Sequence, residues 1–94
     1  MGTSKSTGNT KKRKPRRKRQ YIYLINDDVN SFEYVHKVLM TLCGHNTYQA
    51  EQCAMITHNA GRCLIYSGLG PDPFIIYELL VKHGLTVQIK TTKL

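Results

Sequence analysis

The sequence predicts a small α/β (α+β) domain in which three helices pack on one face of a three-stranded sheet, in the order β-α-α-β-α-β. Three observations lead to this fold class. Runs rich in aromatic and β-branched residues, typical of strands, occur at residues 21–25, 62–66 and 85–90. Between these runs, apolar residues recur at helical spacing. Cap-forming residues stand where each helical pattern begins, and glycines stand where it ends.

The first strand and helix are predicted from residues 21–44. Tyrosine and isoleucine dominate residues 21–25, and residues 27–29 are expected to form a turn. Asn30 is the predicted N-cap, because Glu33 stands three residues later and completes a capping box. Gly44 is placed to end the helix in the left-handed conformation. The expected buried side consists of Val35, Val38, Leu39 and Leu42.

A second helix is predicted to run from the cap residue Asn46 to about Asn59. Gln49 repeats the capping signal, and Gly61 is expected to end the helix. One face of this helix carries only small side chains, namely Ala50, Cys53, Ala54 and Thr57. Another element of the fold can therefore approach that face closely.

The last third of the domain is predicted as strand, loop, helix and strand. Residues 62–66 form the second strand and residues 67–71 a loop. Asp72 is the expected N-cap of the third helix, with Pro73 at its first position. The expected buried side of this helix consists of Phe74, Tyr77, Leu80 and Val81. Apolar and polar residues alternate over 85–90, which predicts a half-buried final strand.

Charge divides the chain into two parts. Residues 1–20 hold nine basic residues and no acid, so the net charge of +8 is +9 on this segment and −1 on the rest. Such a segment buries too little apolar surface to offset the entropy of ordering. We therefore expect a disordered basic tail over residues 1–20 and one folded domain over residues 21–94, with no repeated unit.

The basic run Lys11–Arg19 has three possible roles: a nucleic-acid-binding arm, a ribosome-contacting tail or a solvated linker. The run contains no aromatic residue, so base stacking within it is not expected. Any binding by this run would be driven by phosphate contacts and would depend strongly on salt. Nucleic-acid or ribosome binding through this run is the alternative function that the sequence leaves open.

Several protein classes are not predicted. There is no apolar leader and no run of about 18 apolar residues, so neither a signal peptide nor a membrane span is expected. Cys43, Cys53 and Cys63 form no CxxC pair and are expected to be reduced thiols in a cytoplasmic protein, with no metal. No GxSxG motif, nucleophile–base set or complete dinucleotide-binding loop occurs, so we expect neither an enzyme nor a cofactor.

The triplet Asn26-Asp27-Asp28 is the most informative motif. It places two of the six acids and an amide directly after the first strand. These residues can hold a cation, or they can simply end the strand and start a turn in a small structural domain. His58, near the end of the second helix, likewise has a structural interpretation as a favourable partner of the helix dipole.

Taken together, these motifs resemble the ClpS adaptor family. The resemblance covers about residues 21–91, and it is carried by Tyr23-Leu24-Ile25-Asn26-Asp27-Asp28, Glu33-Tyr34-Val35, Val38-Leu39, Ala50, and His58 with Gly61. It implies an adaptor rather than an enzyme. Such an adaptor binds substrates that begin with a bulky hydrophobic residue, called an N-degron. It delivers them to the N-domain of a ClpA- or ClpC-type AAA+ unfoldase of the Clp protease, and so regulates proteolysis.

The resemblance also implies a two-part site. The α-amino group would be bound by Asn26, Asp27, Asp28 and His58, and the first side chain would enter a pocket formed by Leu24, Asn30, Phe32, Val35, Ala54, Thr57 and Leu85. A free α-amine, with a pKa of about 7.7–8.0, is mostly cationic at neutral pH and needs such acceptors. This chain has Asn30-Ser31-Phe32 where the family usually has Thr-Pro-Met, Ala54 in place of a methionine and Thr57 in place of a valine. We expect these differences to change the shape of the pocket while the amine site is retained.

Overall fold

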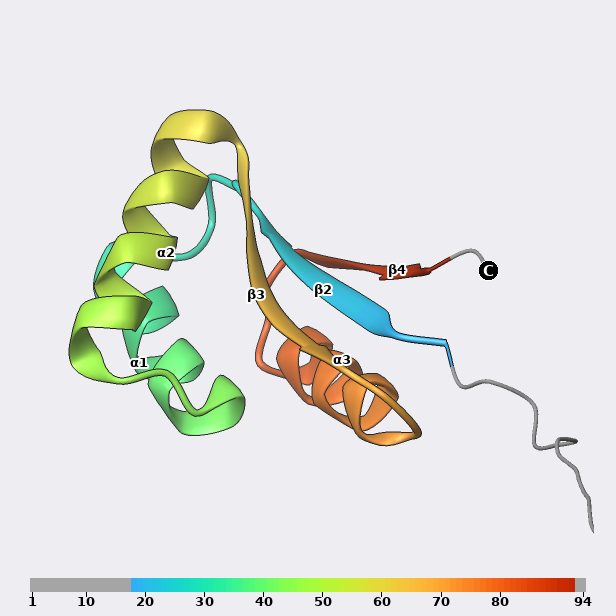
Figure 1. Cartoon of the computed structure of the whole chain (residues 1–94). Helices are drawn as coiled ribbons and strands as arrows, with labels where there is room; N and C mark the ends of the chain where they lie inside the picture. The colour runs from blue at the N-terminus through green and yellow to red at the C-terminus, as the bar shows by residue number, and fades with distance from the viewer. Residues whose placement is uncertain (1–17, 93–94) are drawn as a thin grey trace, which may run out of the picture.

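The computed structural model describes residues 18–92, so most of the expected disordered tail, residues 1–17, lies outside the described part. The predicted boundary at residue 20 is wrong, because Gln20 is buried and is the first residue of a strand. The order of elements is the predicted β-α-α-β-α-β (Figure 1). The elements are β2 (Gln20–Ile25), α1 (Phe32–Cys43), α2 (Thr47–Ala60), β3 (Arg62–Gly68), α3 (Asp72–Lys82) and β4 (Val87–Thr91). None of these three helices has the length and apolar character that a membrane span requires.

The strands form one antiparallel sheet in the order β3-β2-β4, with the helices gathered on one side of it (Figure 1). Along β2, Gln20, Ile22 and Leu24 are buried beneath the helices, and the residues between them are only half-buried. This alternation is the period of two that a strand with one covered face requires. The central position of β2 places its last residue between the two outer strands and beside the helix layer.

A β-bulge shifts the register between β2 and β3. Ile22 pairs with Tyr66 and Tyr23 pairs with Leu64, so Ile65 is the additional residue on β3. Ile65 is only 4% exposed, and its carbonyl accepts a hydrogen bond of 2.7 Å from Nε2 of the buried His45. The bulge therefore adds an apolar side chain to the core and joins β3 to the connection between α1 and α2.

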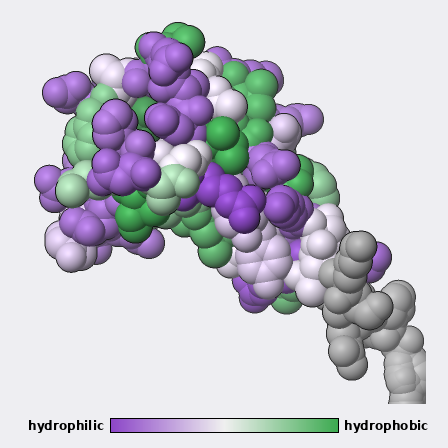
Figure 2. Space-filling view, turned by 90° about the horizontal axis from the view of Figure 1, so that it is seen from above, coloured by the Kyte–Doolittle hydropathy of each residue, from purple (hydrophilic) through white to green (hydrophobic). Residues whose placement is uncertain are grey.

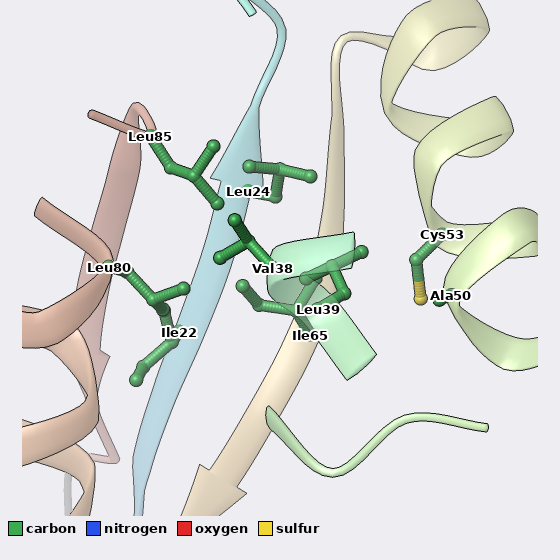
Figure 3. Packing of buried hydrophobic residues seen from close by; sticks show 9 residues of the cluster. All are labelled: Ile22, Leu24, Val38, Leu39, Ala50, Cys53, Ile65, Leu80 and Leu85. Carbon is green, nitrogen blue, oxygen red and sulfur yellow. The ribbon is translucent and has the colours of Figure 1, made fainter. Parts of the chain in front are cut away.

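The core lies between the sheet and the helices (Figure 3). Its buried members are Ile22, Leu24, Val38, Leu39, Ala50, Cys53, Ile65, Leu80 and Leu85. The small face predicted for α2 is confirmed, since all four of its residues are buried. The predicted stops at Gly44 and Gly61 are also confirmed, because both adopt positive φ angles of 71° and 96°.

The predicted N-cap of α1 is wrong by one residue. Ser31 is the cap, and its hydroxyl oxygen accepts a hydrogen bond of 3.1 Å from the Tyr34 amide. The Asn30 side chain is directed elsewhere, and its Nδ2 donates to Asp27 Oδ2 and to the Gly84 carbonyl, each at 2.9 Å. Asn46, by contrast, caps α2 as predicted, through a 2.7 Å hydrogen bond from the Gln49 amide.

The prediction for α3 is wrong in two respects. The N-cap is Pro71 rather than Asp72, so Pro73 occupies the second helical position. Pro73 and Leu80 are buried, whereas Phe74 and Val81 are each 49% exposed. The outer face of this helix is itself apolar, and periodicity alone therefore assigned its buried side incorrectly.

The strand boundaries differ slightly from the predicted ranges. Pairing with Gln20 extends β3 to Gly68, and β4 starts at Val87 rather than at residue 85. Leu85 is nevertheless buried, at 5% exposed, and its amide donates to the Leu80 carbonyl over 3.1 Å. It therefore belongs to the turn that ends α3, and not to the strand.

The three cysteines are free thiols, with Cys53 buried and Cys43 and Cys63 half-buried. Burial raises the pKa of the Cys43 thiol to about 11. Burial, together with a hydrogen bond and electrostatic interaction with Cys63, raises the pKa of the Cys53 thiol to about 12. These two thiols therefore remain protonated at neutral pH. Within residues 18–92, no group of three or more His, Cys, Asp or Glu side chains is arranged to hold a metal ion.

Candidate functional site

Three segments meet where β2 ends. The Ile25 amide donates to the Thr86 carbonyl, and the Asn26 amide donates to the Gly61 carbonyl, each over 2.9 Å. These bonds join the end of β2 to the segment before β4 and to the end of α2, at the top of the view in Figure 1. Residues distant in sequence, including Asn26 and His58, are thereby brought to one end of the sheet.

Asp27 organises the turn that follows. Its Oδ1 accepts from the Val29 and Asn30 amides, each at 3.0 Å. Its Oδ2 accepts from Asn30 Nδ2 at 2.9 Å and from the Thr86 hydroxyl at 2.8 Å. Burial alone would raise the pKa of this carboxyl, but the hydrogen bonds, that from the Asn30 amide first, outweigh it and lower the pKa to about 2. Asp27 is therefore ionised at neutral pH, and both of its oxygens are engaged within the protein.

Asn30 connects this turn to the opposite side of the site. Its Nδ2 donates both to Asp27 and to the Gly84 carbonyl. Gly84 has a φ of 85°, a conformation that favours glycine, and it directly precedes the buried Leu85. The double hydrogen bond of Asn30 therefore sets the position of Leu85 relative to the start of α1.

A cavity of about 90 Å³ opens between these elements. Residues from β2, the following turn, α1, α2 and the segment before β4 line it: Leu24, Ile25, Asn26, Asp27, Asn30, Phe32, Val35, Ala54, Thr57, His58 and Leu85. Ten of these are residues singled out from the sequence. Asp28 was also singled out but is not a lining residue, and it is exposed. Ile25 was missed because strand alternation assigns it to the face opposite Leu24.

The apolar part of the cavity comes from both layers of the fold. Leu24 and Leu85, on the sheet side, are 2% and 5% exposed, and Ala54, on α2, is 6% exposed. Thr57 is also buried, but its hydroxyl donates to the Cys53 carbonyl at 2.8 Å, so that proton is used within α2. Phe32 is 43% exposed at the start of α1. An apolar side chain entering this space would contact mainly carbon atoms.

Asn26 and His58 form the polar part, and both are exposed. Neither side chain makes a hydrogen bond to another residue in the described part of the chain, although the Asn26 backbone amide does. An amide oxygen and the unprotonated nitrogen of a neutral imidazole are both acceptors. Figure 2 shows the molecule from the end of the sheet at which β2 ends. Hydrophilic and hydrophobic residues lie next to one another on this surface. A group that combines a cationic donor with an apolar side chain matches this arrangement.

The fold and the cavity define a small α/β binding domain. The family model described as "ATP-dependent Clp protease adaptor protein ClpS" matches residues 15–70, more than half of the chain. The chain therefore belongs to the ClpS family of ATP-dependent Clp protease adaptor proteins, which confirms the family expected from its motifs. The match ends before α3 and so does not include Leu85, whose expected place in the pocket agrees with the cavity lining of the structure.

A solved structure shows the same fold. It is Agrobacterium tumefaciens ClpS2 bound to L-phenylalaninamide, which superposes with a TM-score of 0.68 at 19% sequence identity. The superposition covers 82% of this chain and 100% of the other. At this identity the similarity establishes the fold alone. No sequence among curated proteins matches this chain.

Proposed function

We propose that this protein binds the first residue of substrate proteins in the cavity at the end of β2 and delivers those proteins to a Clp unfoldase. The observation that carries this proposal is the pairing of two unengaged acceptors, Asn26 and His58, with a buried apolar wall in one cavity. The ligand of ClpS2, L-phenylalaninamide, has a free α-amine and an aromatic side chain, and so has the same two-part chemistry.

Each polar residue has its own role in this proposal. The α-ammonium donates to Asn26 Oδ1 and to a ring nitrogen of His58, because a buried ammonium needs such partners to offset its desolvation. Asp27 holds the turn and adds negative charge without donating or accepting directly, since its oxygens are already engaged. Asp28 adds charge from outside the cavity.

The first side chain of the substrate would enter the apolar part of the cavity. Complete burial of a leucine or phenylalanine side chain contributes about 1.5–3 kcal/mol. Together with capture of the amine, this contribution is compatible with micromolar affinity, which corresponds to about −8 kcal/mol. Because Phe32 and Ala54 replace two methionines that are usual in the family, this chain would have its own preference among bulky first residues.

The amine site can be tested with fluorescein-labelled peptides that begin with Phe or Leu, followed by fluorescence anisotropy. We expect Asn26→Ala and His58→Ala each to weaken binding about 10-fold or more, because each removes a hydrogen bond to a charged group. Asn59→Ala is the matched control, since Asn59 is exposed, adjacent to His58 and does not line the cavity. Equal affinity for the N-acetylated peptide would refute the proposed amine site.

Delivery requires a second partner, which we propose is the N-domain of a ClpA- or ClpC-type unfoldase in the cytoplasm. Isothermal titration calorimetry with isolated ClpA and ClpC N-domains would measure this interaction. We expect one of them to bind the protein whether or not a Phe-first peptide fills the cavity. Absence of binding to both would leave the peptide site intact but remove its connection to Clp.

A further inference from the structure

The face of the sheet that points away from the helices has a distinct composition. Strand alternation places Tyr21, Tyr23 and Ile25 of β2 on this side, opposite the buried Ile22 and Leu24. The neighbours of these residues on β3 and β4 share the face. We call this surface the open face and define it as Tyr21, Tyr23, Ile25, Arg62, Leu64, Ser67, Gln88 and Lys90. In the part of the chain that the structure describes, no helix covers it (Figure 1).

Cations from both outer strands surround the central tyrosine. The Arg62 guanidinium carbon lies 4.8 Å from the centre of the Tyr23 ring, and Lys90 Nζ lies 5.6 Å from it. A third cation, Arg19, donates from Nη1 to the Ser67 hydroxyl at 3.2 Å, on the strand pair that includes Tyr21. Two cationic side chains thus face the Tyr23 ring, and a third hydrogen-bonds to the residue that pairs with Tyr21.

No negative charge balances these cations on the sheet. All six acids of the chain lie in the turn after β2 or in the helices, and the three strands contain none. Seven further basic residues occupy positions 11–18, directly before Arg19 in sequence. Two cations therefore face one tyrosine ring, and the sheet carries no acid that could pair with either of them. This concentration of positive charge instead matches a polyanion.

We propose that the open face binds single-stranded nucleic acid. Unpaired bases stack on the Tyr21 ring and on the Arg62 guanidinium that lies over the Tyr23 ring, while Arg19 and Lys90 contact phosphates. Sheet surfaces that present two or three aromatic residues, and cationic grooves beside aromatic side chains, are the two common arrangements for such ligands. Tyr21 and Tyr23 are two residues apart on one strand, so their Cα atoms are about 6.6 Å apart and their side chains are neighbours on one face of the sheet.

The open face supplies what the basic run lacks. Residues 11–19 contain no aromatic side chain and could contact phosphates only, whereas the first tyrosine follows two positions after Arg19. The open face also lies on the opposite side of β2 from Leu24, in the wall of the cavity. Of the open-face residues only Ile25 also lines the cavity, so variants at Tyr21 and Tyr23 can separate nucleic-acid binding from peptide binding.

The test uses the full chain and a fluorescein-labelled 12-nucleotide oligouridylate, with anisotropy measured at 50 and 200 mM salt. We expect the double variant Tyr21→Leu/Tyr23→Leu to bind about 25-fold more weakly or worse, because it removes two stacking positions and each stacked base contributes a factor of at least about five. The slope of affinity against salt should not change, since no cation is removed. Tyr48→Leu, at a tyrosine on α2 that is 69% exposed, is the matched control and should bind like the unsubstituted protein.

A second measurement on the unsubstituted protein does not depend on how the variants fold. An abasic ribose-phosphate chain of the same length carries the same phosphates without bases, and we expect it to bind about 10-fold more weakly or worse. Equal affinity for the abasic chain, or unchanged affinity in the double variant, would overturn the proposal and leave phosphate attraction alone. Equally tight binding of an oligoglutamate peptide would overturn it in favour of an acidic protein partner.

Discussion

The Asp27 carboxylate and the side chains of Asn26 and His58 line the same cavity but have opposite hydrogen-bonding states. Asp27 accepts four hydrogen bonds from the protein. The side-chain amide of Asn26 and the His58 ring make none to other residues in the range 18–92, and only the backbone amide of Asn26 is engaged, by the Gly61 carbonyl. Asp27 therefore stabilises the structure of the site, whereas Asn26 and His58 remain available to a ligand. All three residues belong to the motif by which the chain resembles its family. Their difference in hydrogen bonding also shows that an acid next to a binding site need not contact the ligand.

Substitution of Asp27 should have the largest effect. Asp27→Ala leaves the Asn30 amide, the Asn30 side chain and the Thr86 hydroxyl without their acceptor, so we expect a loss of about 3 kcal/mol in the free energy of unfolding. Urea denaturation followed by circular dichroism measures this loss. Asp28→Ala is the control and should change stability by less than about 0.5 kcal/mol. Similar losses in the two variants would contradict the distinction between Asp27 and its neighbour.

Acid should remove part of the same stabilisation. The folded-state pKa of Asp27, about 2, lies below its ordinary value of 3.8, so the unfolded chain binds the proton more readily. This contribution is therefore complete above about pH 4 and is lost as the pH falls towards 2. Denaturation measured in steps between pH 5 and pH 2 should show the decline. In the variant Asp27→Asn, the free energy of unfolding should decline less between pH 5 and pH 2. A pH profile identical to that of the unsubstituted protein would show that Asp27 is not the source of the decline.

The apolar wall offers a smaller effect on ligand preference. Ala54→Met places a longer side chain in a cavity of about 90 Å³, so less space remains for the first side chain of a peptide. We expect affinity for a Phe-first peptide to fall about 5-fold relative to a Leu-first peptide, which corresponds to about 1 kcal/mol. The ratio of the two affinities is the useful measurement, because any general loss of stability affects both. Met55→Leu, at an exposed position of α2, should leave the ratio unchanged.

The smallest effect should come from the charge outside the cavity. Asp28→Asn removes one exposed negative charge without changing a lining residue. We expect about a 2-fold loss of affinity for a Phe-first peptide at 20 mM salt and none at 500 mM, because salt screens exposed charges. Anisotropy at the two salt concentrations measures this effect. A loss of peptide affinity that persists at 500 mM salt would instead indicate that Asp28 contacts the ligand directly.

Local signals were sufficient for most of the fold. Asn46, Gly44 and Gly61 define helix ends through their own backbone and side-chain geometry, and the small face of α2 follows from spacing alone. Local signals could not identify the N-cap of α1, because Asn and Ser are both favourable N-cap residues and Asn30 and Ser31 are adjacent. The choice depends on Gly84, which is 54 residues from Asn30 and occupies its side chain. Interactions between distant segments are not contained in a local pattern.

The candidate site shows the same limit. Family motifs identified ten of the eleven lining residues, because those motifs place the residue types in order along the chain. They did not separate the engaged Asp27 from the unengaged Asn26, because both are polar side chains of one motif and one of the bonds to Asp27 comes from Thr86, 59 residues away. Likewise, the apolar outer side of α3 made its buried face ambiguous, and Phe74 was placed in the core although it is half exposed.

The contact between Arg19 and Thr92 has a practical consequence. The Arg19 carbonyl accepts from both the amide and the hydroxyl of Thr92, at 2.9 and 3.1 Å. The two ends of the folded domain thus lie side by side, and the six residues of β2, about 20 Å, separate them from the cavity. A short linker could join them into a circular permutant with new ends in the loop after β3. A reporter protein attached next to Arg19 or Thr92 would lie at the opposite end of β2 from the cavity.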